Sequence, residues 1–130
     1  MTKEVKGLLQ RLLWSIVKNG EAGIWNAFQD LNGENAEYEF EYAIAALTEL
    51  KNLENGDEID WNSIDCALDI SAKGSGATSL KDKIKVMLDY GYSKAKGDFE
   101  EEDWSKAKEK ELKAMYYPDD ALISELVEAF

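Results

Sequence analysis

Apolar residues recur every three or four positions along most of the chain, which is the spacing of helices that bury one face. The first such segment spans residues 2–18, and the Asn19-Gly20 pair is expected to end it. A second, shorter helix is expected over residues 21–31, ended by Asn32-Gly33. Both pairs are typical of helix ends, because asparagine and glycine tolerate the left-handed backbone conformation found there.

A third helix is predicted over residues 34–54, and it has a broad apolar arc. The residues of that arc are Phe40, Ala43, Ile44, Ala46, Leu47, Leu50 and Leu53. The opposite arc holds Glu34, Glu37, Glu41 and Thr48, with Tyr38 at its border. An arc this wide predicts burial against more than one neighbour, so we expect this helix to be the central one.

The next part of the chain is less regular. Residues 57–61 read as a polar connection anchored by Ile59. Residues 62–72 fit a helix through Ile64 and Leu68, but Cys66, Leu68 and Ile70 also alternate as in a strand. We favour a short helix there. Residues 73–78 contain two glycines among small polar residues and are expected to form a flexible loop.

Three further helices are expected in the remainder. Ser79 can cap the first, which should stop near Gly91, and Asp98 can cap the second. Pro118 suits the first turn of the last helix. The inward residues of that last helix are Leu122, Ile123, Leu126, Val127 and Phe130. No repeat or domain boundary is visible, so residues 1–130 are expected to form one all-α domain, a compact bundle of about six short helices.

The charge of the chain is strongly negative and unevenly distributed. Fifteen basic and 27 acidic residues give a net charge of -12. Residues 19–65 contain twelve acids and a single lysine, a net of -11, whereas residues 73–113 are close to neutral at +1. Such a chain repels nucleic acid and anionic lipid and attracts basic surfaces. Acidity for solubility alone is the alternative, but it does not require this segregation.

Several kinds of chemistry are excluded by composition. The chain has no histidine and one cysteine, so the usual zinc sites and histidine-dependent nucleophilic catalysis are absent. Lys73-Gly74-Ser75-Gly76 lacks the ending of a phosphate-binding loop. We therefore predict no enzyme activity, no cofactor and no metal, although an enzyme that uses only carboxylates remains an alternative.

One segment superficially resembles a calcium-binding loop. Asp30, Asn32, Glu34 and Glu41 have the right spacing, but Asn35 stands where the sharp turn needs glycine. A helix end followed by a helix start is the favoured interpretation.

Compartment is inferred from the cysteine count and the apolar segments. A lone cysteine cannot form an intrachain disulfide, and Cys66 is expected to be a buried structural thiol. The apolar run over residues 8–17 is too short and polar for a membrane span and lacks a signal-peptide cleavage site. A cytoplasmic protein that does not bind membranes is expected.

Two surfaces are candidates for binding a partner, because each combines aromatic and acidic side chains. The first is the outer face of the third helix, with Glu34, Glu37, Tyr38 and Glu41. The second is the segment Tyr116-Tyr117-Pro118-Asp119-Asp120. The alternative interpretation is a solvated helix face for the first and a helix junction for the second, with Tyr116 in the core.

The second segment carries a resemblance to a known family. Tyr-Tyr-Pro followed by acids and a last amphipathic helix, residues 116–130, resembles the late segment of the colicin and pyocin immunity proteins. The first hundred or so residues do not follow that family's pattern; the broader class is the acidic immunity proteins of contact-dependent or type VI toxin systems. The resemblance implies a small helical bacterial protein that blocks a basic nuclease toxin, with Tyr116, Tyr117 and Asp119 in the contact segment.

We therefore predict an acidic inhibitor of a basic protein, in the manner of an immunity protein against a nuclease-type toxin. Tyr38 and Tyr117 are its expected aromatic anchors. A phage-encoded DNA mimic, such as an anti-restriction or anti-CRISPR protein, would use the same carboxylates to imitate phosphates. A third possibility is a helical adaptor domain whose acidity serves only solubility.

Overall fold

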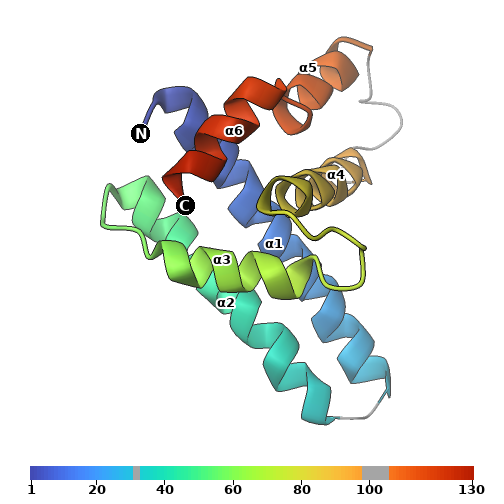
Figure 1. Cartoon of the computed structure of the whole chain (residues 1–130). Coiled ribbons are helices and arrows are strands. Elements are labelled where there is room, and N and C mark those ends of the chain that lie inside the picture. Colours follow the sequence, from blue (N-terminus) through green and yellow to red (C-terminus); the bar gives the residue numbers. More distant parts are fainter. Residues whose placement is uncertain (31–32, 98–105) are drawn as a thin grey trace.

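A computed structural model gives the backbone of residues 1–30, 33–97 and 106–130, and the side chains of residues 1–21, 41–97 and 108–130. Those residues form six α-helices and no strand (Figure 1). The helices are α1 Lys3–Asp30, α2 Gly33–Asn55, α3 Trp61–Ser71, α4 Leu80–Gly97, α5 Lys106–Tyr116 and α6 Asp120–Ala129. The predicted all-α fold of about six helices is confirmed.

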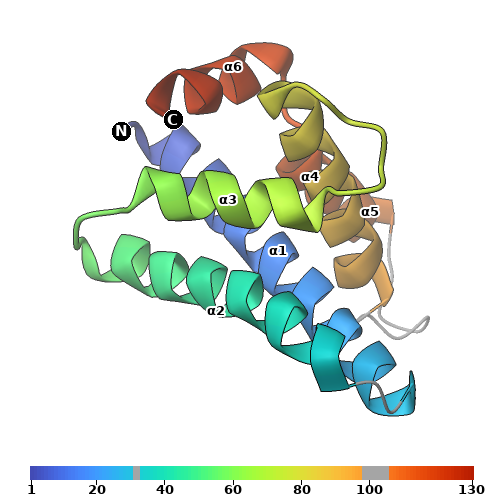
Figure 2. The same ribbon diagram turned by 60° about the horizontal axis from the view of Figure 1, so that its bottom comes forward.

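The central helix is α1, which contacts each of the other five. It is central because its apolar side chains cover a broad arc of the helix, and the side chains of that arc are buried against the surrounding helices. Fully buried side chains are Leu8, Leu9, Leu12, Leu13 and Ile16. The prediction that the helix over residues 34–54 is central was wrong, although α2 does pack against two neighbours, α1 and α3. Figure 2 shows α2 and α3 side by side and antiparallel, with α1 behind them.

Asn19-Gly20 does not end the first helix, contrary to the prediction, because α1 continues through it to Asp30. Gly20 is buried, and the Asn19 side-chain amide donates to the carbonyl oxygen and Oγ of Ser71, at 3.2 and 2.7 Å. The local preference of the pair for a helix end is about 1 kcal/mol, so packing and these hydrogen bonds outweigh it.

Gly91 also fails to end its helix, and α4 continues to Gly97. A Cβ atom at position 91 would lie 1.9 Å from Ser15 Oγ and 2.9 Å from a ring carbon of Tyr116. The glycine is therefore required by the close approach of α4 to α1 and α5, and it marks a helix crossing.

Inward and outward faces of α2 and α3 also differ from the prediction. On α2, Ile44 and Leu47 are 48% and 39% exposed, whereas Tyr42 and Glu49 are buried. Residues 62–72 are helical, as favoured, but Cys66 is exposed and not a buried thiol. The reason is the helical period, which buries Ile64, Ala67 and Leu68 and turns position 66 outward.

The ends of the later helices follow local rules more closely. The Asp60 carboxylate accepts from the backbone N–H groups of Asn62 and Ser63 and so caps α3. Ser79 Oγ accepts from the N–H of Asp82 at the start of α4, as expected. Pro118 lies just before Asp119, the N-cap of α6, and not in the first turn. Asp98, expected to cap a helix, lies outside the described residues.

The close approach at Gly91 gives a stability prediction. Gly91→Ala places a methyl group against Ser15 and Tyr116, so it should lower the free energy of unfolding by about 1–3 kcal/mol. Gly7→Ala is the matched control, because its Cβ would meet only the end of the Arg11 side chain at 3.4 Å. It should raise stability by about 0.5–1 kcal/mol. Urea unfolding of both variants checks this; equal stability would contradict the close approach.

The exposure of Cys66 gives a second prediction. Its thiol should react with a disulfide reagent such as dithionitrobenzoate in the folded protein, without added denaturant, because exposed thiols are accessible to it. One equivalent of released thiolate is expected, and Cys66→Ser should release none. A reaction that begins only after unfolding would place Cys66 in the core.

Candidate partner-binding surfaces

The exposed acids over residues 41–65, on α2, the α2–α3 connection and the first turns of α3, have no ion-pair partner among the described residues. Over residues 41–65, where side chains are described, there are seven acids and one lysine, a net of -6. Six of the acids are exposed: Glu41, Glu54, Asp57, Glu58, Asp60 and Asp65. None of them forms an ion pair with a described residue. Their charge therefore faces solvent without an internal counter-charge.

The lysines of α4 and α5 are engaged elsewhere. Lys81 and Lys85 bind the Asp120 carboxylate of α6 at 3.6 and 2.9 Å. Their effect is to lower the pKa of Asp120, through the hydrogen bond from Lys85 first and the charge of Lys81 next.

Two more groups of ion pairs continue this pattern. Lys83 binds Asp69 of α3 at 2.8 Å, and this hydrogen bond with its charge lowers the pKa of Asp69. Lys96 and Lys113 both approach Glu109, at 3.9 and 3.5 Å. The uneven charge of the sequence is thus also uneven in space, because these ammonium groups are bound to acids outside residues 41–65.

The α2–α3 connection combines acids with apolar groups. Ile59 and Trp61 are half-buried, and the Trp61 ring lies 5.1 Å from that of Phe130 at the end of the chain. A surface pocket of ≈ 480 Å³ is lined by Glu58, Ile59, Asp60, Trp61 and Asn62. Sequence reasoning counted these acids but did not select them as a surface; the signal was the acid cluster on both sides of Ile59.

Glu49 holds this connection in place. Its side chain is only 5% exposed, and its carboxylate accepts from the backbone N–H of Asp60 at 2.9 Å. The Asp57 N–H donates to the Asn52 carbonyl at 2.8 Å, and Gly56 takes the positive φ of 75° that the turn needs. The exposed acids are thus displayed on an ordered turn anchored to α2.

The first predicted surface is only partly described. Glu41 is exposed on α2. Glu34, Glu37 and Tyr38 also belong to α2, but their side chains lie outside the described set.

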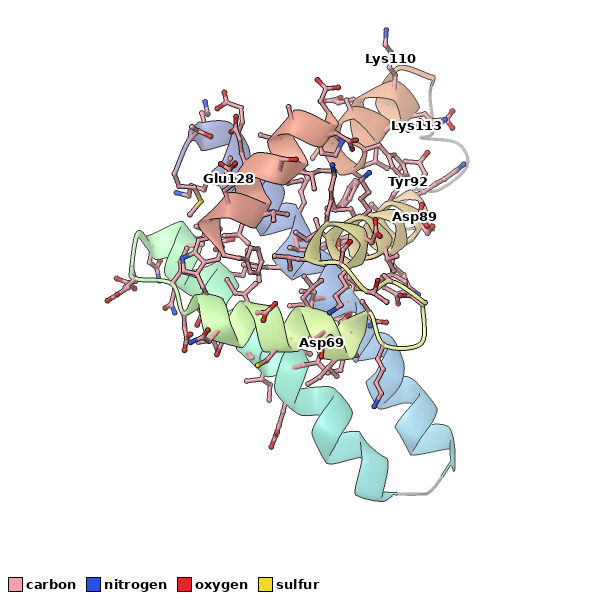
Figure 3. All side chains as sticks on the ribbon, viewed as in Figure 1. Asp69, Asp89, Tyr92, Lys110, Lys113 and Glu128 are labelled. Atoms are coloured by element: carbon pink, nitrogen blue, oxygen red, sulfur yellow. The ribbon has the colours of Figure 1, made fainter. Side chains whose placement is uncertain are left out.

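The second predicted surface divides between core and solvent. Tyr116 is 6% exposed, with its ring 6.2 Å from Trp14 and 6.5 Å from Tyr92, so it belongs to the core. Tyr117 is 48% exposed, and its hydroxyl donates to the Asp89 carboxylate. Its two neighbours on α4 are Asp89 and Tyr92, whose ring lies 5.2 Å from that of Tyr117; both are labelled in Figure 3.

The acids that follow have separate places. Asp119 is the exposed N-cap of α6, without a side-chain capping bond, and Asp120 is bound by the two lysines described above. A pocket of ≈ 500 Å³ lies between α4 and this junction, lined in part by Val86, Pro118 and Ile123. Of the aromatic residues predicted here, only Tyr117 is available to a partner.

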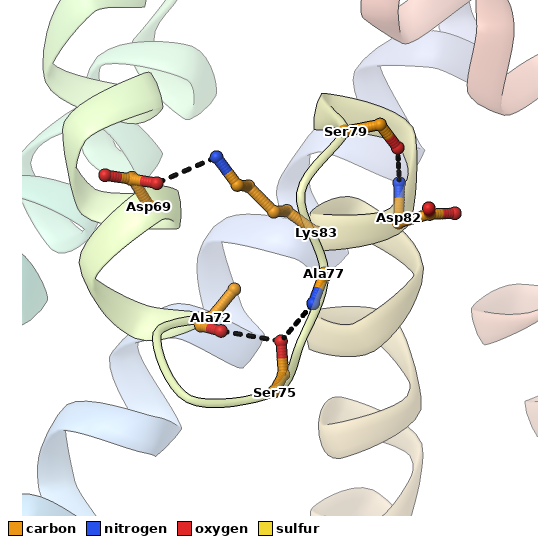
Figure 4. A network of polar contacts seen from close by, with 7 residues as sticks. All are labelled: Asp69, Ala72, Ser75, Ala77, Ser79, Asp82 and Lys83. Carbon is orange, nitrogen blue, oxygen red and sulfur yellow. Dashed lines mark hydrogen bonds and ion pairs between the residues drawn. The ribbon is translucent and has the colours of Figure 1, made fainter.

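The loop that superficially resembled a phosphate-binding motif satisfies its own polar groups (Figure 4). The Ser75 hydroxyl donates to the Ala72 carbonyl at 2.6 Å and accepts from the N–H of Ala77 at 3.2 Å. Lys83 of α4, the lysine drawn in Figure 4, points toward Asp69 of α3 and binds it. The arrangement is that of a connector between α3 and α4.

Neither a metal site nor a membrane span is present in the described part of the chain. No three His, Cys, Asp or Glu side chains converge there as a metal site requires. No helix in those ranges has both the length and the apolar content needed to cross a bilayer.

The Tyr117–Asp89 contact gives a titration prediction. Partial burial and the adjacent Asp89 carboxylate raise the pKa of Tyr117 from 10.0 to about 12. Because the folded pKa is the higher one, the stabilisation from this contact is complete below pH 10 and is lost as pH rises through about 12. The difference between the tyrosinate absorbance curves of wild type and Tyr117→Phe should show this transition. In the Asp89→Asn background it should move toward 10; a transition at 10 with Asp89 intact would contradict the contact.

Comparison with known proteins leaves the chain without a relative to argue from. No family model, no curated protein and no solved structure matches it. The function proposed below is therefore argued from the charges and contacts of this chain.

Proposed function

We propose that this chain is an inhibitory binding protein that occludes a basic protein, in the manner of an immunity protein against a nuclease-type toxin. One observation carries the proposal: six exposed acids over residues 41–65 have no ion-pair partner among the described residues. Five lysines of α4 and α5 are instead bound to Asp69, Glu109 and Asp120, which lie outside this range. Lys51 is the one base within residues 41–65, so a net charge of -6 is left there for a basic partner to neutralise.

The mechanism is electrostatic steering followed by occlusion. An acidic surface raises the rate at which a basic partner arrives, and this gain falls as salt rises. A nuclease toxin must be positively charged where it holds nucleic acid phosphates. An acidic protein seated on that surface blocks access of the substrate without any catalytic group.

The anchored connection supports this role. Since Glu49 and Gly56 fix the turn, its backbone loses little conformational freedom when the acids bind. Ile59 and Trp61 lie among them and offer apolar contact area beside the charges.

A charge-reversal pair tests the proposal. Glu54→Lys/Asp57→Lys/Glu58→Lys reverses three exposed acids whose side chains make no ion pair or cap with described residues, so the fold should survive. The control Glu111→Lys/Glu125→Lys/Glu128→Lys reverses three exposed acids on α5 and α6, and Figure 3 labels Glu128 there. Both variants change the net charge from -12 to -6.

The measurement is capture of basic proteins from host lysate at low and physiological salt, followed by a nuclease assay with the captured protein. Wild type and the α5–α6 control should retain one basic nuclease stoichiometrically at both salts and inhibit it. The α2–α3 variant should bind it about a hundredfold more weakly or worse, because like charges would then face each other.

Other outcomes point to the rival functions. Equal binding by both reversed variants would remove the α2–α3 acids from the interface. A captured DNA-binding protein that is released by duplex DNA would indicate a DNA mimic. A diffuse set of basic proteins, all lost at physiological salt, would indicate acidity for solubility alone.

A further inference from the structure

An apolar pair stands on the outer side of α2. Ile44 is 48% exposed and Leu47 is 39% exposed, and they are one turn apart, so they share one side of the helix. They are the only large apolar side chains of α2 exposed to this degree among residues 41–55. Of the other apolar residues in that range, Tyr42, Ala43, Ala46 and Leu53 are buried, Leu50 packs against the core and Ala45 is half-buried. The helix thus has a second apolar strip that the fold does not use.

This pair is continuous with the acidic surface. Steps of three or four residues along the same side of α2 lead from Glu41 to Ile44, Leu47, Lys51 and Glu54. All five are exposed. The last of them, Glu54, begins the acids of the α2–α3 connection. The apolar pair is therefore flanked by Glu41 at one end and by Lys51 and then Glu54 at the other.

The negative charge of the chain determines which kind of partner can cover Ile44 and Leu47. A second copy of this chain would bring another net charge of -12 to a helix side bounded by Glu41 and Glu54, which opposes self-association. An anionic lipid surface is repelled for the same reason. A basic protein surface gains from the same charges, and apolar groups on it would gain from covering Ile44 and Leu47.

We infer that Ile44 and Leu47 form the apolar centre of the docking surface, and that they seat the apolar side chains of a basic, amphipathic partner segment. The inference rests on the proposed function, and it assigns separate kinetic roles to the acids and to the apolar pair. The acids set the association rate and its salt dependence, whereas the apolar pair sets the dissociation rate. Truncating contacts at the centre of an interface acts mainly on dissociation.

The test uses a defined probe: a synthetic amphipathic helix of leucine and lysine, beside a counterpart of equal charge in which serine replaces leucine. Association and dissociation rates are measured by surface plasmon resonance for wild type, Ile44→Gln/Leu47→Gln, and the control Ile70→Gln. Ile70 is 50% exposed on α3, so the control removes an equally exposed apolar group elsewhere. Circular dichroism should show all three proteins folded, because glutamine is a good helix former.

Wild type and Ile70→Gln should bind the leucine–lysine helix about tenfold or more tightly than the serine–lysine helix. Ile44→Gln/Leu47→Gln should lose that preference through faster dissociation, with its association rate and salt dependence unchanged. Glu54→Lys/Asp57→Lys/Glu58→Lys should show the opposite pattern, a slower association.

Three results would overturn the inference. If wild type binds both helices equally, or if Ile44→Gln/Leu47→Gln behaves as wild type, the apolar pair is not a docking centre; the proposed function would survive provided that the charge-reversed variant still loses binding. If sedimentation shows that wild type is a dimer and that Ile44→Gln/Leu47→Gln is a monomer, the occupant is a second copy. If the charge-reversed variant also binds the leucine–lysine helix normally, the proposed function fails as well.

Discussion

The crossing of α4 over α1 at Gly91 is the constraint on which the arrangement of the other helices depends. The missing side chain lets the α4 backbone lie against Ser15, and Tyr116 of α5 closes the same contact from the other side. Because α1 contacts every other helix, the position of α4 on it also places the α5–α6 junction. Core packing of this density leaves little room for adjustment, so one added methyl group would disturb three helices together.

This packing also explains how the charges are divided. Once α4 lies between α3 and the α5–α6 segment, its lysines face Asp69 on one side and Asp120 on the other. Lys96 similarly approaches Glu109 of α5. The exposed acids over residues 41–65 form no ion pair with these ammonium groups. The acidity of that part of the surface is thus a result of topology as well as of composition.

Local sequence rules predicted elements well where the signal was itself local. The caps at Ser79 and the helix over residues 62–72 depend on hydrogen bonds and spacing within a few residues. The rules failed at Asn19-Gly20 and Gly91, because the partners that decide these positions, Ser71 and Ser15, are distant in sequence. The face of α2 was misplaced for a different reason: Tyr42 and Glu49 share the helical spacing of the buried Ala46 and Leu53, but their polar groups excluded them from an arc chosen by apolar residues.

The candidate surfaces were likewise predictable from the sequence only in part. The charge count identified the acidic region, but Tyr116 proved to be a core residue, as the alternative interpretation of a helix junction had it, and only Tyr117 is exposed. The acids around Ile59 were overlooked because only the folded turn displays them together. That turn is held by Glu49, which accepts a hydrogen bond from the N–H of Asp60, eleven residues away in the sequence.

The freedom of those acids has a consequence for how such a surface can change over time. Glu54, Asp57 and Glu58 make no side-chain bond to the described residues, whereas Glu49 beneath them and Asp60 beside them hold the turn. Under the proposed function, substitution at the three outer positions would alter what the surface recognises and leave the folding of the bundle almost untouched. A lineage would then reach new specificities at these positions by single steps, each retaining a folded protein, without first acquiring compensating changes in the core.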